Sequence, residues 1–191
     1  KIDDAVFIAE QQFMAVLIQV PRAIDRTMFG QLTIEHFMTS VFRTLFQAIA
    51  AAGGLPSDDT PQGLWIHNLI KAGGPMLNQV INELAVMPLP LPGDDTGNGA
   101  QPAQPGVPGG AGAPSAAAVQ LRPAAPEEQR YATELLTRLL DMGFMRQIGL
   151  SKRRMAQLPD GEEKITLLGQ ITRMETARKD LQAQIYGNTV G

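Results

Sequence analysis

Apolar positions are most regular near the C-terminal end of the chain, over residues 129–186. Two long runs flank a breaker at residues 158–161, which contains Pro159 and Gly161. Apolar residues recur at helical spacing in the first run at Tyr131, Leu135, Leu136, Leu139, Leu140, Met145, Ile148 and Met155, and in the second at Ile165, Leu168, Ile171, Met174, Leu181 and Ile185. The pattern predicts a helical hairpin. Because two helices enclose little interior, we expect its apolar stripes to need a partner, either the earlier part of the chain or another protein.

Five shorter amphipathic segments precede the hairpin. The expected helices span about residues 7–20, 22–29, 34–49, 61–72 and 75–87. Pro21 and Pro88 end the first and the fifth, since proline disfavours helical conformation in the residue before it. Thr33 is the expected N-cap of the third helix and Thr60 that of the fourth, because a threonine hydroxyl accepts a hydrogen bond from an amide of the first turn.

No segment alternates between apolar and polar residues with a period of two, so the predicted fold is all-α. It consists of a five-helix globular bundle at residues 1–89 and a long C-terminal helical hairpin at residues 127–191. Between them, residues 90–126 are rich in Pro, Gly, Ala and Gln and almost free of charge. Such a segment cannot bury enough surface to offset the entropy lost on ordering, which predicts a disordered linker or insertion.

Composition narrows the function classes. The net charge of −3 and the pI near 5.4 argue against a domain that mainly grips phosphate backbones. The chain has no cysteine, which excludes disulfides and thiolate metal sites. No apolar run approaches the roughly 20 residues needed to span a membrane. Because the sequence begins at Lys1 without a methionine or a signal pattern, we expect a fragment of a longer protein.

Residues that often carry chemistry lack the context for it. The two histidines, His36 and His67, lie on different predicted helices, where a surface or partly buried polar role is expected for each. The acidic pairs at residues 58–59 and 94–95 fall in turns or linker, where capping and solubility account for them. A glycine-rich stretch at residues 109–112 follows no strand, which excludes a phosphate-binding loop. We therefore expect no catalytic residue, no metal ligand and no cofactor site in this chain.

The concentrated basic run is Lys152, Arg153 and Arg154. A solvated helix face is the simpler interpretation, and a contact for an acidic partner surface or acidic peptide tail is the alternative. Trp65 is expected in the core. Glycines at positions 143, 149 and 169 interrupt the hairpin helices at a cost of about 1 kcal/mol each relative to alanine, and they indicate a bend or a close helix approach.

Several stretches together resemble a known family. They are YATELLTRLL (131–140), RQI (146–148) and LLGQITRMETARKDL (167–181) in the hairpin, and AEQQFMAVLIQVP (9–21), FR (42–43), AIAAAGG (48–54) and NELAV (82–86) in the bundle. In order and spacing they are similar to the C-terminal domain of bacterial DNA primase of the DnaG type, closest to actinobacterial forms. The resemblance covers almost the whole chain apart from about residues 90–126, an insertion by this comparison.

The resemblance implies a non-catalytic helicase-binding domain. In that family the hairpin docks on the N-terminal domain of the replicative DnaB-type helicase, and this recruits primer synthesis to the replication fork. The parent protein is then a primase, a DNA-directed RNA polymerase of the cytoplasm and replisome, whose zinc-binding and magnesium-dependent catalytic domains have no counterpart here. A further partner in the family is the acidic tail of single-stranded DNA-binding protein, for which the basic run is the candidate contact.

For helicase binding, the expected contact is the apolar stripe near Leu181, Ile185 and Tyr186, which the partner helix of the hairpin is expected to leave uncovered. Two other readings stay open. The N-terminal domain of the replicative helicase itself is similar in architecture, and an uncharacterised helical enzyme is a third class.

Overall fold

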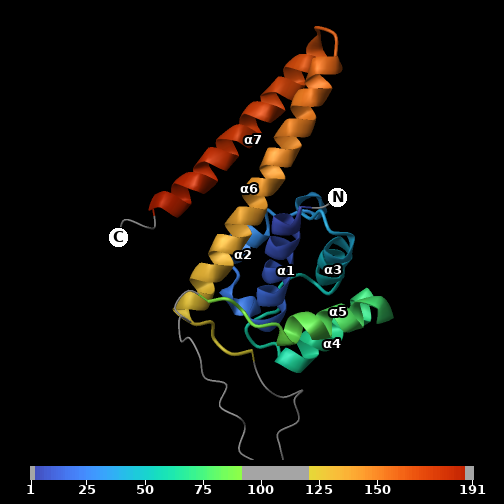
Figure 1. The fold of residues 1–191 in the computed structure, drawn as a ribbon, viewed down its shortest axis with the longest axis vertical. Helices are drawn as coiled ribbons and strands as arrows, with labels where there is room; N and C mark the ends of the chain where they lie inside the picture. The colour runs from blue at the N-terminus through green and yellow to red at the C-terminus, as the bar shows by residue number, and fades with distance from the viewer. Residues whose placement is uncertain (1–2, 92–120, 188–191) are drawn as a thin grey trace, which may run out of the picture.

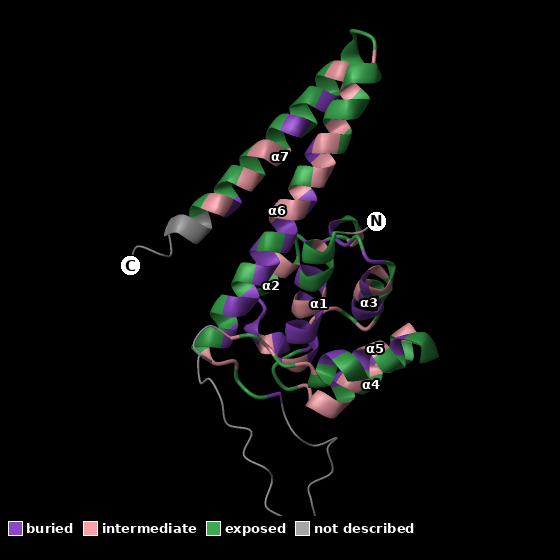
Figure 2. Ribbon diagram, viewed as in Figure 1, coloured by how far each residue is buried: buried purple, intermediate pink, exposed green. Residues whose placement is uncertain are grey.

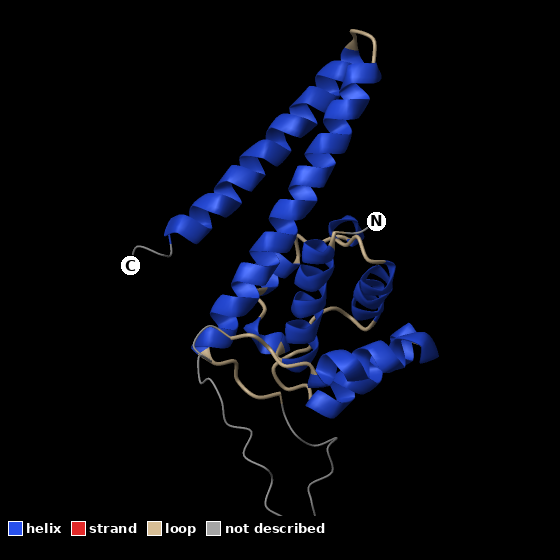
Figure 3. Cartoon of the chain, viewed as in Figure 1, coloured by secondary structure: helices blue, strands red, loops and turns tan. Residues whose placement is uncertain are grey.

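The computed structural model describes residues 3–91 and 121–187, and these ranges contain helices and loops but no strand (Figures 1 and 3). The elements are α1 (Asp4–Gln19), the 3-10 turn η1 (Pro21–Ala23), α2 (Arg26–Phe29), the 3-10 turn η2 (Ile34–His36), α3 (Ser40–Ala51), α4 (Gln62–Gly73), α5 (Pro75–Val86), α6 (Pro126–Gln157) and α7 (Glu162–Gly187). The all-α prediction is confirmed. Most of the segment predicted to be disordered, residues 92–120, lies outside the described residues.

Helices α1, α4, α5, α6 and α7 occur where the sequence predicts them, with ends shifted by a few residues. The predicted second helix, by contrast, is divided into η1 and α2. Asp25 causes the division because its Oδ1 accepts the Met28 amide at 2.7 Å and caps a new helix start. Gly74, with a φ of 72°, separates α4 from α5 in a conformation that favours glycine.

The prediction of a single third helix that begins at residue 34 is wrong. Only one 3-10 turn forms at η2, and α3 begins at Ser40. The cause is Glu10 of α1, which is completely buried and accepts the amides of Met38 at 2.6 Å and Thr39 at 3.0 Å. A carboxylate satisfies these amides without helical bonds, so the backbone can stay extended up to Thr39 while Phe37 remains in the core.

The first half of α6 completes the core of the bundle. Its buried residues share one cluster with those of α1, α3, α4 and α5, among them Phe13, Leu17, Leu45, Trp65, Leu69, Ile81, Leu135, Leu136, Leu139 and Leu140. In Figure 2 the part of α6 that runs beside α1 is largely coloured as buried. A fully buried leucine contributes about 1.5–3 kcal/mol, so four of them hold α6 firmly. The boundary predicted at residue 127 therefore does not separate two cores. The core position predicted for Trp65 is confirmed.

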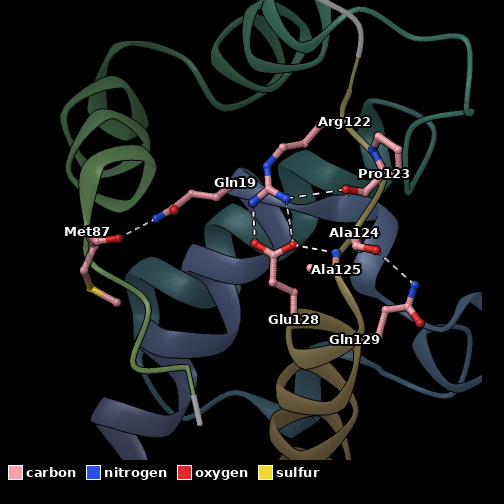
Figure 4. A network of polar contacts seen from close by, with 8 residues as sticks. All are labelled: Gln19, Met87, Arg122, Pro123, Ala124, Ala125, Glu128 and Gln129. Carbon is pink, nitrogen blue, oxygen red and sulfur yellow. Dashed lines mark hydrogen bonds and ion pairs between the residues drawn. The ribbon is translucent and has the colours of Figure 1, made fainter. Parts of the chain in front are cut away.

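The start of α6 is fastened by an ion pair (Figure 4). Buried Glu128 accepts two hydrogen bonds from the Arg122 guanidinium and one from the Ala125 amide at 2.8 Å. The bond from Arg122 lowers the pKa of Glu128, and the Ala125 bond has the same effect. Across the same view, Gln19 at the end of α1 donates to the carbonyl of Met87 at 2.7 Å. Gln19 thus ties the end of α5 to α1, while the Arg122 and Ala125 bonds hold the residues just before α6 against its first turn.

Replacing Glu10 by alanine is expected to lower the free energy of unfolding by about 2–4 kcal/mol, because two amides lose a charged acceptor in the interior. Chemical denaturation followed by circular dichroism measures the change. Glu83→Ala is the matched control, since Glu83 is exposed and bonds only Gln79 one helical turn away among the described residues. Equal stability of both variants would contradict the role given to Glu10.

Candidate protein-binding site

The second half of α6 extends beyond the bundle and pairs with α7 (Figure 1). We call residues 144–177 the arm. It has a small core of its own, formed by Ile148, Leu167 and Ile171 with Phe144, Met155, Leu158 and Met174 packed around them. Phe144 also packs against the main core, so it connects the two clusters. The described part of the hairpin is therefore anchored at its base and projects at its tip.

One side of the hairpin is closed by polar contacts between its helices. Lys152 donates to Glu175 at 2.7 Å, and Asp141 accepts from Arg178 at 2.6 Å and from Gln182 at 3.3 Å. The bond from Lys152 lowers the pKa of Glu175 below its usual value. A partner docking on this side would have to break or desolvate these pairs.

An open groove of about 530 Å³ lies on the other side. Its lining is Glu35 from η2, Gln147, Leu150 and Ser151 from α6, and Gln170, Arg173 and Met174 from α7. At about 100° per residue, Lys152 lies roughly 200° around α6 from Leu150, which places the ion pairs away from the groove. Leu150 is 63% exposed. An exposed leucine in a groove with few charges is suited to contact a partner protein.

The groove ends where α6 crosses η2. A Cβ atom at position 143 would lie 2.1 Å from Cδ2 of buried His36, so Gly143 permits a contact that any other residue would obstruct. The ring of Phe144 meets the imidazole edge-on, with centroids 6.1 Å apart. Arg146 donates to the carbonyl oxygens of His36 at 2.6 Å and Glu35 at 3.3 Å. Of the two interpretations offered for this glycine, close approach is the one that the structure shows.

His36 is held in its neutral form. The Thr33 amide donates to Nδ1 at 3.0 Å, which requires this nitrogen to be unprotonated. Burial lowers the pKa of His36 and outweighs a backbone hydrogen bond with Thr33, which raises it; the Arg146 charge lowers the pKa further, and the Glu35 charge raises it.

Of the three residues predicted to contact helicase, only Leu181 has a described side chain. Leu181 is 6% exposed and belongs to the main core cluster, so it does not lie on an uncovered stripe. The side chains of Ile185 and Tyr186 lie outside the described residues. Ile165 and Leu168, which the sequence analysis places in the apolar stripe of α7, are 72% and 52% exposed.

The basic run lies on the exposed surface of α6. Lys152 pairs with Glu175, and Arg154 pairs with Glu163 at 2.8 Å. Leu150 and Arg173 are groove residues that the sequence prediction omitted. The exposure of Leu150 could have been predicted from the sequence. The residue is out of phase with the apolar period that includes Ile148, which places it on the exposed face of the helix.

Sites for metals and membranes are not found in the part of the chain that the structure describes. No three His, Cys, Asp or Glu side chains there are grouped to hold a metal ion. No helix in this part is long and apolar enough to cross a bilayer. Asp58 lies 3.7 Å from Arg22, while the acidic pair at 94–95 and the glycine-rich stretch at 109–112 fall outside the described residues.

No family model and no curated protein matches the chain. In fold, it is similar to a solved structure, the helicase-binding domain of primase from Mycobacterium tuberculosis, with a TM-score of 0.58. The two share 21% sequence identity over 94% of this chain and 92% of that one. The likeness therefore includes both the bundle and the hairpin, and it confirms the expected resemblance at the level of the fold.

Lowering the pH from 7.5 to 5.5 is expected to destabilise the protein through His36. An unfolded histidine takes up its proton near pH 6.5, whereas the folded state resists protonation until lower pH. The unfolded state then binds more protons, so stability present above this pKa is lost as the pH falls. Denaturation at a series of pH values measures this slope, which His36→Asn should reduce. His67→Gln is the control and should retain the slope; a slope unchanged by His36→Asn would refute the assignment.

Proposed function

We propose that this chain is a non-catalytic interaction module of a DNA primase, which binds the N-terminal domain of the replicative DnaB-type helicase and recruits primer synthesis to the replication fork. One observation carries the proposal, namely fold similarity over 94% of this chain to a domain whose name states that it binds helicase. Small helical bundles serve many functions, so the match of the projecting hairpin as well as the bundle is what gives the similarity weight. Zinc and magnesium then belong to catalytic domains elsewhere in the parent primase, which acts at the cytoplasmic replisome.

The alternative, the N-terminal domain of the helicase itself, is less well supported. The similar solved structure is the primase domain that binds helicase. The interaction module is therefore the preferred function.

The groove side of the hairpin is the contact surface that we propose for helicase. Leu150 offers exposed apolar area at its wall, and Arg173 and Glu35 offer charges of opposite sign at its edge. Burying an exposed leucine gains free energy, whereas covering the ion pairs on the other side would cost their solvation. Such contacts typically bury about 800 Å² on each partner, so the groove would form the centre of a larger interface.

The acidic tail of single-stranded DNA-binding protein is left out of the proposal. Lys152 and Arg154 already pair with acids of α7, and within the described residues Arg153 alone of this run makes no ion pair. The basic run is thus better explained as a solvated helix face with interhelical pairs.

Leu150→Asp is expected to weaken binding to the helicase N-terminal domain about tenfold or more, because a charge would enter the apolar centre of the interface. Isothermal titration calorimetry with the cognate helicase domain measures this. Leu168→Asp is the matched control, since Leu168 is similarly exposed but lies roughly 140° around α7 from Arg173. Equal losses from both variants would rule out the groove, and no binding by the unaltered protein would rule out the function.

Ile185 and Tyr186 remain a prediction from sequence. If they contact helicase, replacing both by alanine should weaken binding at least about fivefold, because an aromatic side chain is a frequent anchor of protein interfaces. The double substitution is preferable to removing residues 181–191, since that deletion would also remove buried Leu181 and disturb the core. Surface plasmon resonance against the same helicase domain would decide, and unchanged affinity would remove these residues from the contact.

A further inference from the structure

Helix α6 is continuous over 32 residues but has two packing environments. Up to Leu140 it contributes to the main core, and from Ile148 onward it packs in the small core of the arm. The change occurs at residues 143–146, where Gly143 and Arg146 face η2. The direction of the arm is therefore set over about one helical turn.

The contact at this turn is closely fitted. Gly143 leaves room for the His36 ring and no more, because a Cβ would lie 2.1 Å from Cδ2 and 2.8 Å from Nε2. The ring cannot simply rotate away, since Nδ1 accepts the Thr33 amide and the Phe144 ring packs against it edge-on, with centroids 6.1 Å apart. A larger residue at position 143 would have to displace the helix from η2.

Arg146 adds a directional bond to this contact. Its guanidinium is partly desolvated and donates to backbone carbonyls of η2 rather than to a mobile side chain. Those carbonyls are themselves fixed, because Glu10 holds the amides of Met38 and Thr39 just beyond them. The bond thus connects the arm to the rigid part of the bundle.

The same turn closes one end of the groove. Glu35, which lines the groove with α6 and α7 residues, is one of the two residues whose carbonyls Arg146 binds. Moving α6 away from η2 would therefore remove Glu35 from the groove.

We propose that Gly143, His36 and Arg146 form a latch that fixes the direction in which the arm leaves the bundle and holds Glu35 at the end of the groove. The latch is a property of this chain alone. Its consequence for helicase binding rests on the proposed function.

The absence of cysteine from the sequence allows a direct test. Met76→Cys on α5 and Ile165→Cys on α7 place spin labels at positions that are 89% and 72% exposed, one on the bundle and one on the arm. Pulsed electron paramagnetic resonance then measures the distribution of distances between the two labels. Gly143→Ala is expected to shift or broaden the distance distribution. Gly149→Ala on the same helix is the matched control, because a Cβ there meets nothing within 4 Å in the described structure, and it should leave the distribution unchanged.

Two further variants keep the test decisive if Gly143→Ala folds poorly. Arg146→Gln removes the bonds to η2 without a steric clash and should broaden the distribution. His36→Ala combined with Gly143→Ala should restore it, because the missing ring makes room for the new methyl group while Arg146 still binds the backbone. An unchanged distribution in both Gly143→Ala and Arg146→Gln would overturn the latch.

The helicase experiment separates the latch from the proposed function. If the latched state falls to about a tenth of the population, the apparent Kd for the helicase N-terminal domain should rise about tenfold, and the double variant should recover it. Distances that change as expected while the unaltered protein does not bind helicase would support the latch and overturn the proposed function. If the unaltered protein binds helicase but neither Gly143→Ala nor Arg146→Gln changes the distances, the proposed function is supported and the latch is overturned.

Discussion

The continuity of α6 between two cores is the constraint on which the rest of the structure depends. Its first half is buried in the bundle through a series of leucines, and its second half carries the arm. Because a helix is stiff over such a length, the orientation of its buried half is transmitted to the tip, and small adjustments at Gly143 are amplified there. Bundle and hairpin are therefore mechanically one unit, although 29 residues outside the described ranges separate them in sequence.

A single buried acid prepares the surface on which α6 docks. Glu10 replaces the helical hydrogen bonds that the segment before Ser40 would otherwise form, so the chain turns at η2 and exposes the carbonyls of Glu35 and His36. Burying a carboxylate is costly unless it is hydrogen-bonded, and here each oxygen of Glu10 accepts one backbone amide. Buried Glu10 of α1 thereby influences the contact of Arg146 with η2, although the two residues are more than 130 positions apart in the chain.

The two sides of the hairpin differ in a way that suits an interaction module. Ion pairs join the helices on one side, while the groove side carries an exposed leucine, a methionine, three uncharged polar residues and two residues of opposite charge. The first side stabilises the hairpin in water, and the second leaves apolar area that a partner can cover.

Local signals in the sequence determined the all-α fold and the ends of most helices, because Pro21, Gly74 and the breaker at 158–161 act on their own neighbours. They marked Gly143 as a bend or a close helix approach without deciding between the two. Only the tertiary structure decided the break before α3, the burial of Leu181 and the groove around Leu150. Each of these results from contacts between residues far apart in sequence. Glu10, for example, accepts hydrogen bonds from amides 28 and 29 positions away. The period of apolar residues does not indicate which distant residues will meet.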